Sequence, residues 1–135
     1  MELYKAFQIS AAGMRAQGTR LRVAAENVAN ADSLPTGPGQ EPYRRKLLTF
    51  KNVMDREIGA ELVKVNKVIT DKSDFGLKYE PSHPAANDQG YVQTPNVEPL
   101  VEMMDLREAQ RSYEANLNVI QSSRSMLLKT LDILQ

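Results

Sequence analysis

The sequence predicts a mainly α-helical fold with a small β insertion. A long helix at each end of the chain is expected to pack with the other as a coiled-coil-like pair, with short β-strands and loops between them. Apolar residues recur about every seven positions near both termini, which is typical of two helices that wind around each other. All seven prolines of the 135 residues lie between the two patterns. We therefore expect one discontinuous helical domain, residues 1–30 with 98–135, and a loop and β region over residues 31–97.

The first helix is predicted over residues 2–29, which contain no proline and seven alanines. Gly13 and Gly18 each cost a helix about 1 kcal/mol relative to alanine, so we expect this helix to need a packing partner. Asn30 is expected to end it, because asparagine tolerates the left-handed cap conformation. The apolar stripe of this helix consists of Leu3, Phe7, Met14, Leu21 and Val28.

The middle region is predicted to be loops and a few strands, since it holds six of the seven prolines and five of the seven glycines. Residues 43–50 and 61–70 are predicted strands, the second because it is rich in β-branched residues. Residues 75–80 are expected to form the hairpin partner of 61–70, and residues 83–97 to be rich in turns. Because so few strands bury little apolar surface, this region alone would be only marginally stable.

The second helix is predicted over residues 98–135, because neither proline nor glycine occurs after Pro99. Asn96 is a candidate N-cap, and proline suits the first helical turn. Asn116 and Arg124 lie near the apolar line and are candidates for setting its register. The apolar stripe of this helix consists of Leu106, Tyr113, Leu117, Ile120, Leu127, Leu131 and Leu134.

Charge distinguishes the two helices. Residues 1–30 carry four basic and two acidic side chains, a net charge of +2, whereas residues 98–135 carry four basic and six acidic ones, a net charge of −2. Opposite charges favour pairing of the first helix with the second, although exposed ion pairs contribute only about 0–1 kcal/mol each. The stripes allow either a self-contained hairpin under a β cap or an assembly. Assembly is favoured by apolar residues off the stripes, namely Leu100, Val101, Met104, Leu128 and Ile133.

Composition and motifs exclude most chemistry. The chain has no cysteine, which excludes disulfides, cysteine–zinc sites and thiol catalysis. A formal net charge of zero argues against nucleic-acid binding. The single histidine, His83, lies in a predicted turn and is interpreted as structural, and neither a GxSxG elbow nor a glycine-rich phosphate loop is present. We therefore expect no enzyme, no metal site and no cofactor.

Three clusters have a functional and a plainer interpretation. The run Arg44-Arg45-Lys46 beside Tyr43 suits a phosphate or polysaccharide contact, but a solvated strand edge is favoured. Asp71 and Asp74 are interpreted as a solvated turn rather than a calcium site, and the other carboxylates as helix-surface groups. The Met103-Met104 pair is interpreted as packing. No segment reaches transmembrane length and the start lacks a signal-peptide pattern, so we expect neither membrane insertion nor general secretory export.

Several segments resemble the bacterial flagellar rod and hook axial proteins. Residues 10–14 (SAAGM) followed by 26–31 (ENVANA) are similar to the N-terminal signature of that family. His83-Pro84-Ala85 with residues 90–97 (GYVQTPNV) resembles its proximal-rod members, and residues 103–134 resemble its C-terminal helix. Residues 33–39 depart from the usual TPGY, which leaves the contacts of that loop open. The motif residues are Asn27, Ala29, Asn30, His83, Pro84, Gly90, Tyr91, Pro95 and Asn96.

The resemblance implies a structural subunit of the proximal rod, which polymerises through its terminal helices into the axial drive shaft, transmits torque and encloses the export channel. It implies a place in the flagellar basal body, in the periplasmic space, and export through the flagellar type III apparatus without a Sec signal peptide. The implied partners are other copies of the chain, the rod proteins FlgB, FlgF and FlgG, FliE, and the export apparatus. The two apolar stripes would then form the assembly interface.

Two other functions stay open at this point. One is a monomeric helical-hairpin adaptor or chaperone of a secretion system. The other is a carbohydrate-binding module that uses Tyr43, Arg44 and Arg45.

Overall fold

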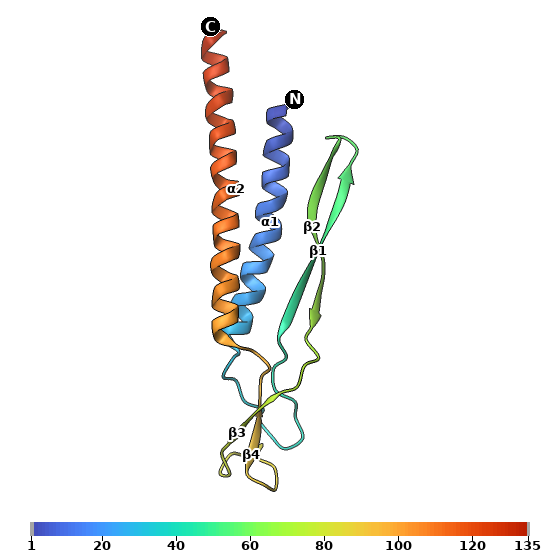
Figure 1. The fold of residues 1–135 in the computed structure, drawn as a ribbon, viewed down its shortest axis with the longest axis vertical. Helices are drawn as coiled ribbons and strands as arrows, with labels where there is room; N and C mark the ends of the chain where they lie inside the picture. The colour runs from blue at the N-terminus through green and yellow to red at the C-terminus, as the bar shows by residue number, and fades with distance from the viewer. Residues whose placement is uncertain (1, 135) are drawn as a thin grey trace.

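The computed structural model describes residues 2–134 and shows two long antiparallel helices, a β-hairpin alongside them and a smaller hairpin at one end (Figure 1). This confirms the predicted combination of two terminal helices with a small β region. The predicted end residues Met1 and Gln135 lie outside the described residues. The elements in chain order are α1 (Glu2–Ala29), β1 (Lys46–Asp55), β2 (Ala60–Thr70), β3 (Gly76–Tyr79), β4 (Tyr91–Thr94) and α2 (Pro99–Ile133).

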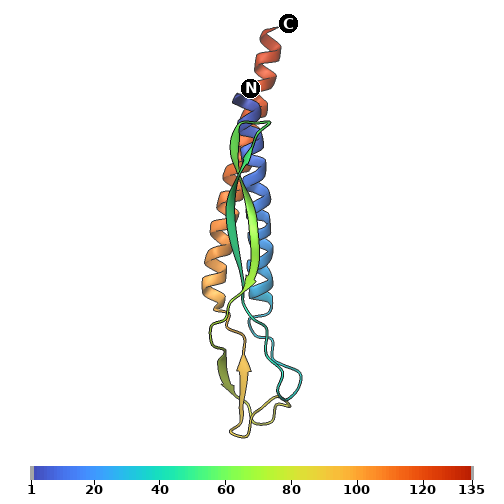
Figure 2. The same cartoon turned by 90° about the vertical axis from the view of Figure 1, so that its right-hand side faces the viewer.

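Helix α1 is the central element of the molecule. Helix α2 packs against one side of it and the β1–β2 hairpin against the other (Figures 1 and 2). Leu62, the buried residue of β2, lies beside Ala12 and Ala16 of α1. Short side chains on α1 let both neighbours approach closely. The buried residues of α1 are Ser10, Ala12, Ala16, Val23, Ala24 and Asn27.

Both helices begin and end within two residues of their predicted bounds, but their ends form differently. The side chain of Asn30 donates a hydrogen bond to the carbonyl of Glu26 at 2.8 Å. No described non-glycine residue has a positive φ, so the prediction that Asn30 ends α1 in the left-handed conformation was wrong. Pro99 begins α2 as predicted, but its N-cap position is Glu98, which makes no side-chain cap hydrogen bond. The assignment of Asn96 as the cap was therefore also wrong.

The strands pair within two separate hairpins. Strands β1 and β2 are antiparallel from Lys46↔Thr70 to Asp55↔Ala60, and a four-residue loop joins them, in which Gly59 has φ +66°. The first strand, predicted over residues 43–50, thus begins three residues later and ends five residues later than predicted. Residues 75–80 were wrongly expected to pair with β2, because β3 pairs with β4 instead. Strand β2 is already paired along its length with β1, its neighbour through a tight turn.

The small hairpin lies beyond the base of the helix pair (Figure 1). The predicted turn region 83–97 contains turns and also strand β4. Gly90 precedes β4 with φ +86°, and a Cβ there would lie 2.9 Å from Cε2 of Tyr79. Tyr79 and Tyr91 pack edge-to-face with ring centroids 5.3 Å apart. The close approach and the positive φ both require glycine at residue 90.

No helix within residues 2–134 combines the length and the hydrophobicity that crossing a membrane requires.

The two glycines of α1 differ in what surrounds them, and this predicts different effects of alanine. Apart from the adjacent backbone of α1 itself, no atom lies within 4 Å of a Cβ placed at Gly18, so Gly18→Ala should raise the free energy of unfolding by about 0.5–1 kcal/mol. A Cβ at Gly13 would lie 2.7 Å from Nδ2 of Asn116 in α2. Gly13→Ala should therefore stabilise less than Gly18→Ala, or destabilise, in urea unfolding followed by circular dichroism. Equal stabilisation by both would contradict the close helix contact.

Candidate assembly surface and its supporting junction

Asn27 joins three parts of the chain at the base of the molecule. Its side chain is buried in the last turn of α1, with 1% of the residue exposed. Its Nδ2 donates to the carbonyl of Lys46 at 2.9 Å and to Glu102 of α2 at 3.0 Å. Its Oδ1 accepts from the backbone N–H of Lys46 at 2.9 Å and from the Tyr43 hydroxyl at 2.8 Å. An asparagine amide has two donors and two acceptor positions, so all four are used.

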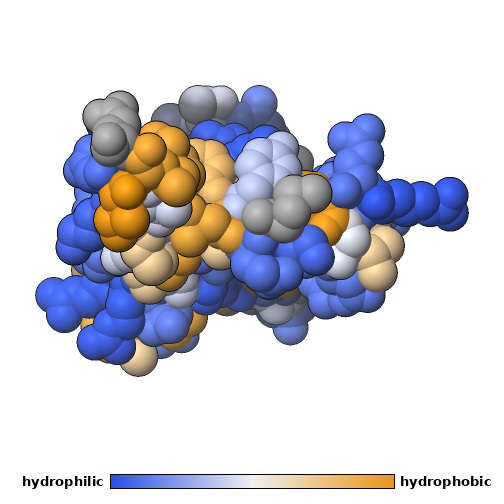
Figure 3. Space-filling view, turned by 90° about the horizontal axis from the view of Figure 1, so that it is seen from above, coloured by the Kyte–Doolittle hydropathy of each residue, from blue (hydrophilic) through white to orange (hydrophobic). Residues whose placement is uncertain are grey.

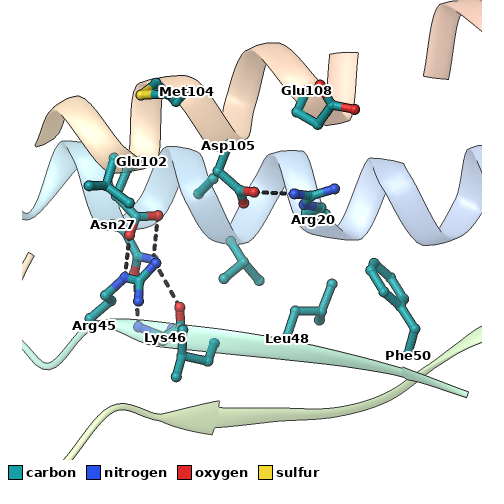
Figure 4. Close-up of a pocket in the computed structure, with 14 residues that line it drawn as sticks. Arg20, Asn27, Arg45, Lys46, Leu48, Phe50, Glu102, Met104, Asp105 and Glu108 are labelled. Atoms are coloured by element: carbon teal, nitrogen blue, oxygen red, sulfur yellow. Dashed lines mark hydrogen bonds and ion pairs between the residues drawn. The ribbon is translucent and has the colours of Figure 1, made fainter. Parts of the chain in front are cut away.

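Glu102 is the buried charge of this junction, with 1% of the residue exposed. One carboxylate oxygen accepts from Asn27, and the other pairs with the guanidinium of Arg45 (Figure 4). Arg45 also lies 3.7 Å from a carboxylate oxygen of Asp71. A buried carboxylate is tolerated only when it is paired and hydrogen-bonded, so these partners determine where the first turn of α2 can lie.

Asn96 connects the segment before α2 to the base of the β1–β2 hairpin. Its Oδ1 accepts from the backbone N–H of Arg45 at 2.7 Å. Its Nδ2 donates to the carbonyl of Asp71 at 3.1 Å and to the hydroxyl of Ser73 at 3.0 Å. Asn96 therefore bridges three backbone segments instead of capping the helix.

The basic run is engaged within the subunit. The guanidinium of Arg44 lies 4.2 Å from the centre of the Phe75 ring, and Arg45 pairs with Glu102. The ammonium of Lys46 lies 2.8 Å from a carboxylate oxygen of Glu26. The interpretation as a solvated strand edge was therefore wrong, because each cation has an internal partner.

The junction shifts the pKa values of several of its groups. The hydrogen bond from Lys46 lowers the pKa of Glu26 below 4.5, and the same contact raises the pKa of Lys46. Hydrogen bonds from Ser73, with the backbone N–H 2.8 Å away, lower the pKa of Asp71 below 3.8. Burial raises the pKa of Tyr43 above 10.0. The junction therefore favours the ionised carboxylates and the neutral phenol.

The line along which α2 faces α1 is made of small and polar residues. Glu102, Ala109, Asn116 and Ser123 occur seven apart on α2, and all but the half-buried Asn116 are buried. Glu102 lies opposite Asn27, and Asn116 lies opposite Gly13. The interpretation of Glu102 as a helix-surface carboxylate was wrong, because this side chain is buried. Its seven-residue spacing from buried small residues was the available signal.

The predicted interface residues flank this line, and none of them is fully buried. Eight are half-buried within the subunit, namely Leu3, Met14, Leu21, Val28, Leu106, Tyr113, Leu117 and Ile120. Four are exposed, namely Phe7, Leu127, Leu131 and Leu134. The residues expected off the stripes are exposed too, namely Leu100, Val101, Met104, Leu128 and Ile133. Met103 and Met104, interpreted as packing residues, are also exposed in the subunit, so that interpretation was wrong.

The last part of α2 extends beyond α1 (Figure 1). Since Asn27 is opposite Glu102 and Gly13 opposite Asn116, the start of α1 is level with about residue 127 of α2. We call residues 127–134 the tail. Leu127 is 51% exposed and Leu134 is 78% exposed. Viewed from this end, hydrophobic surface gathers over the helix termini (Figure 3). Leu127 lines a shallow hollow with Leu3, Tyr4 and Phe7 of α1, and the tail beyond it is exposed.

The remaining family-motif residues lie in the helix end and in the small hairpin. His83 is half-buried. Its Nδ1 accepts a hydrogen bond from the backbone N–H of Ala85 at 3.1 Å, in line with a structural role. Gly90 and Pro95 are buried, whereas Ala29, Pro84 and Tyr91 are exposed. Within residues 2–134, no group of three or more His, Asp or Glu side chains could hold a metal ion.

Comparison with known proteins relates this architecture to one family. Residues 88–133 match the family model described as flagellar basal body rod FlgEFG protein C-terminal. The chain is 47% identical over 133 residues to the flagellar basal-body rod protein FlgC of Agrobacterium fabrum, covering 98% of this chain and 96% of that protein. It is 44% identical to FlgC of Salmonella typhimurium, covering 98% of both chains, and 37% identical to FlgC of Bacillus subtilis, covering 98% and 99%.

Removing the Asn27 amide should weaken the whole junction. Asn27→Ala leaves the Lys46 backbone groups and the buried Glu102 without their partner, so we expect a loss of about 2–4 kcal/mol in the free energy of unfolding. Asn30→Ala, a matched control that removes one side-chain hydrogen bond to a backbone carbonyl, should cost about 1 kcal/mol or less. Denaturant unfolding of both variants would measure the difference. Equal losses would show that Asn27 has no special role.

The lowered pKa values predict a loss of stability in acid. A carboxyl group whose pKa is lower in the folded state stabilises the fold above its unfolded pKa, and this contribution is lost as the pH falls. The wild-type free energy of unfolding should therefore decline below the ordinary values of 4.5 for Glu26 and 3.8 for Asp71. The double variant Glu26→Gln/Asp71→Asn should decline less steeply in thermal melts between about pH 5 and pH 3. An unchanged slope would contradict these assignments.

Proposed function

The chain belongs to the FlgC family of flagellar basal-body rod proteins and is a structural subunit of the flagellar rod, and on this premise we propose that it polymerises through its terminal helices into the proximal rod. The observation that carries this proposal is the uncovered apolar surface on both helices. Ile133 and Leu134 are more than half exposed in the part of α2 that extends beyond α1. Large exposed apolar patches are typical of interaction surfaces.

We propose that α1 and α2 pair in a coiled-coil-like manner. We also propose that the two helices form one domain and that residues 31–97 form a separate loop and β region. The seven-residue spacing of Glu102, Ala109 and the positions that follow supports this pairing. The flanking apolar residues would then serve contacts between subunits. The predicted interface set stays part of this proposal, with its half-buried members contributing to both kinds of contact.

The same arrangement supports a role in the drive shaft. We propose that the assembled helices transmit torque and enclose the export channel. A shear force on a long helix pair is distributed over many contacts along about 40–50 Å. The junction at Asn27 and Glu102 ties both helices to the hairpin at one end, so that the subunit can move as one body.

Further parts of the proposal follow from the family. The proposed location is the periplasmic part of the basal body, reached through the flagellar type III apparatus without a Sec signal peptide. The proposed neighbours are other copies of the chain, FlgB, FlgF, FlgG and FliE. We propose a structural role without catalysis or cofactor.

The two other functions considered from the sequence are less well supported. A monomeric adaptor would leave the apolar tail in water without a purpose. A carbohydrate site at Tyr43, Arg44 and Arg45 would compete with the internal partners of these side chains, since Tyr43 donates to Asn27 and Arg45 pairs with Glu102.

Substitution of one tail residue should separate assembly from folding. Leu127 is exposed, so Leu127→Asp should leave the unfolding transition of the monomer nearly unchanged. In an assembled interface the buried charge should weaken association by about 100-fold or more, as measured by sedimentation of polymer and by swimming of a complemented strain. Ser125→Asp adds the same charge at an exposed polar position and should have a small effect. A motile Leu127→Asp strain with normal polymer would remove the tail from the interface.

Ile120→Asp provides a second comparison, because Ile120 is half-buried within the subunit. This variant should lose both monomer stability and assembly, whereas Leu127→Asp should lose assembly alone.

A further inference from the structure

A groove lies at the base of the molecule, at the end opposite the tail. We call it the basal groove. Its floor is formed by α1, one side by the first turns of α2 and the other by β1, and its volume is about 750 Å³ (Figure 4). Its apolar lining includes Val23, Ala24, Leu48, Phe50, Val101 and Met104.

The subunit cannot fill this groove by itself. Val23 and Ala24 on the floor are short, and the backbones of α2 and β1 are not in contact across it. Phe50, Val101 and Met104 on its two sides all remain exposed. An occupant that supplies apolar side chains would remove this surface from water.

The tail of the same chain cannot reach the groove. Residues 101 and 127 are 26 positions apart on one continuous helix, which corresponds to about 39 Å. A tail that enters the basal groove must therefore come from another molecule.

The tail and the groove match in length, and the tail leucines match the apolar part of a lining that also holds the Arg20–Asp105 ion pair and Glu108. The groove side contributed by α2 runs from Val101 to Glu108, and the tail runs from residue 127 to residue 134, so that each covers about two helical turns. Leu127, Leu131 and Leu134 follow the spacing of one helix face. If a second copy is displaced along its neighbour by 26 helical positions, Leu127 reaches Val101 and Leu131 reaches the turn that contains Met104.

The same displacement brings unpaired opposite charges together. It places Arg124, one turn before Leu127, beside Glu98, one turn before Val101. Both side chains are exposed, and within residues 2–134 neither takes part in an ion pair. Charge complementarity of this kind sets register and orientation more than affinity.

We propose that the tail of one copy of this chain docks into the basal groove of a second copy, parallel to its α2, with Arg124 beside Glu98. This inference rests on the proposed polymerisation and specifies the contact through which it occurs. Because tail and groove are different surfaces at opposite ends of the subunit, the contact is head-to-tail and does not close on itself in a dimer, which is the requirement for a helical polymer.

Cysteine cross-linking tests the contact in the full chain, because the natural sequence contains no cysteine. The double variant Met104→Cys/Leu131→Cys, oxidised in its polymerised form, should give a ladder of covalent oligomers. Each single variant alone should give almost none, and a mixture of the two singles should give a dimer. The control Gln110→Cys/Leu131→Cys, with the first cysteine at an exposed α2 position outside the groove, should give at most a tenth of the ladder.

The outcomes separate this inference from the function on which it rests. Sedimentable wild-type polymer without the 104–131 ladder would overturn the docking inference alone, as would efficient dimers of Leu131→Cys, which would mean that tails pair with each other. Absence of polymer in the wild-type chain would overturn the proposed polymerisation and the docking together.

Charge reversal provides a second, independent measurement. Arg124→Glu and Glu98→Arg should each raise the critical concentration for polymerisation about 5- to 10-fold, and the double variant should return it to within about twofold of wild type. Additive losses in the double variant would contradict the pairing. Circular dichroism melts of each monomer would confirm that the substitutions leave the fold intact.

Discussion

The four hydrogen bonds of the Asn27 amide are the constraint on which the rest of the structure depends. They satisfy both backbone groups of Lys46 as a neighbouring strand would, and one of them reaches the buried carboxylate of Glu102. A buried amide and a buried carboxylate are stable only if all their partners are present. The end of α1, the start of β1 and the first turn of α2 can therefore form only together, and this coupling gives the long subunit one rigid end.

The close approach of the helices determines which residues stay outside. Gly13 and Ala109 leave room for the two backbones, so the longer apolar side chains lie beside the contact line rather than within it. A helix pair packed in this way buries little apolar surface within the subunit. It keeps leucines and methionines exposed, from which the rod subunit can form contacts with its neighbours. The tail continues the same helix where α1 has already ended.

Much of the fold was predictable, because helix and strand patterns are local. The absence of proline and glycine after Pro99 predicted α2, and the β-branched residues of 61–70 predicted β2. Pairing was less predictable, since residues 75–80 have a strand pattern that suits β2 or β4 equally. The candidate site was predicted in part. The motif singled out Asn27 and Asn96 without their roles, and Arg45 was assigned to solvent because its partner Glu102 is 57 residues away.

The sequence by itself determined that this chain has two long terminal helices with apolar stripes, no cysteine, and the motifs of flagellar axial proteins. These properties depend on residue type and on spacing along the chain. Only the tertiary structure decided that Glu102 is buried, that the contact line is small and polar, and that the residues of the apolar stripes are half-buried or exposed in the subunit. Those outcomes depend on which residues meet across long sequence separations, and burial depends on the neighbours that a folded chain supplies.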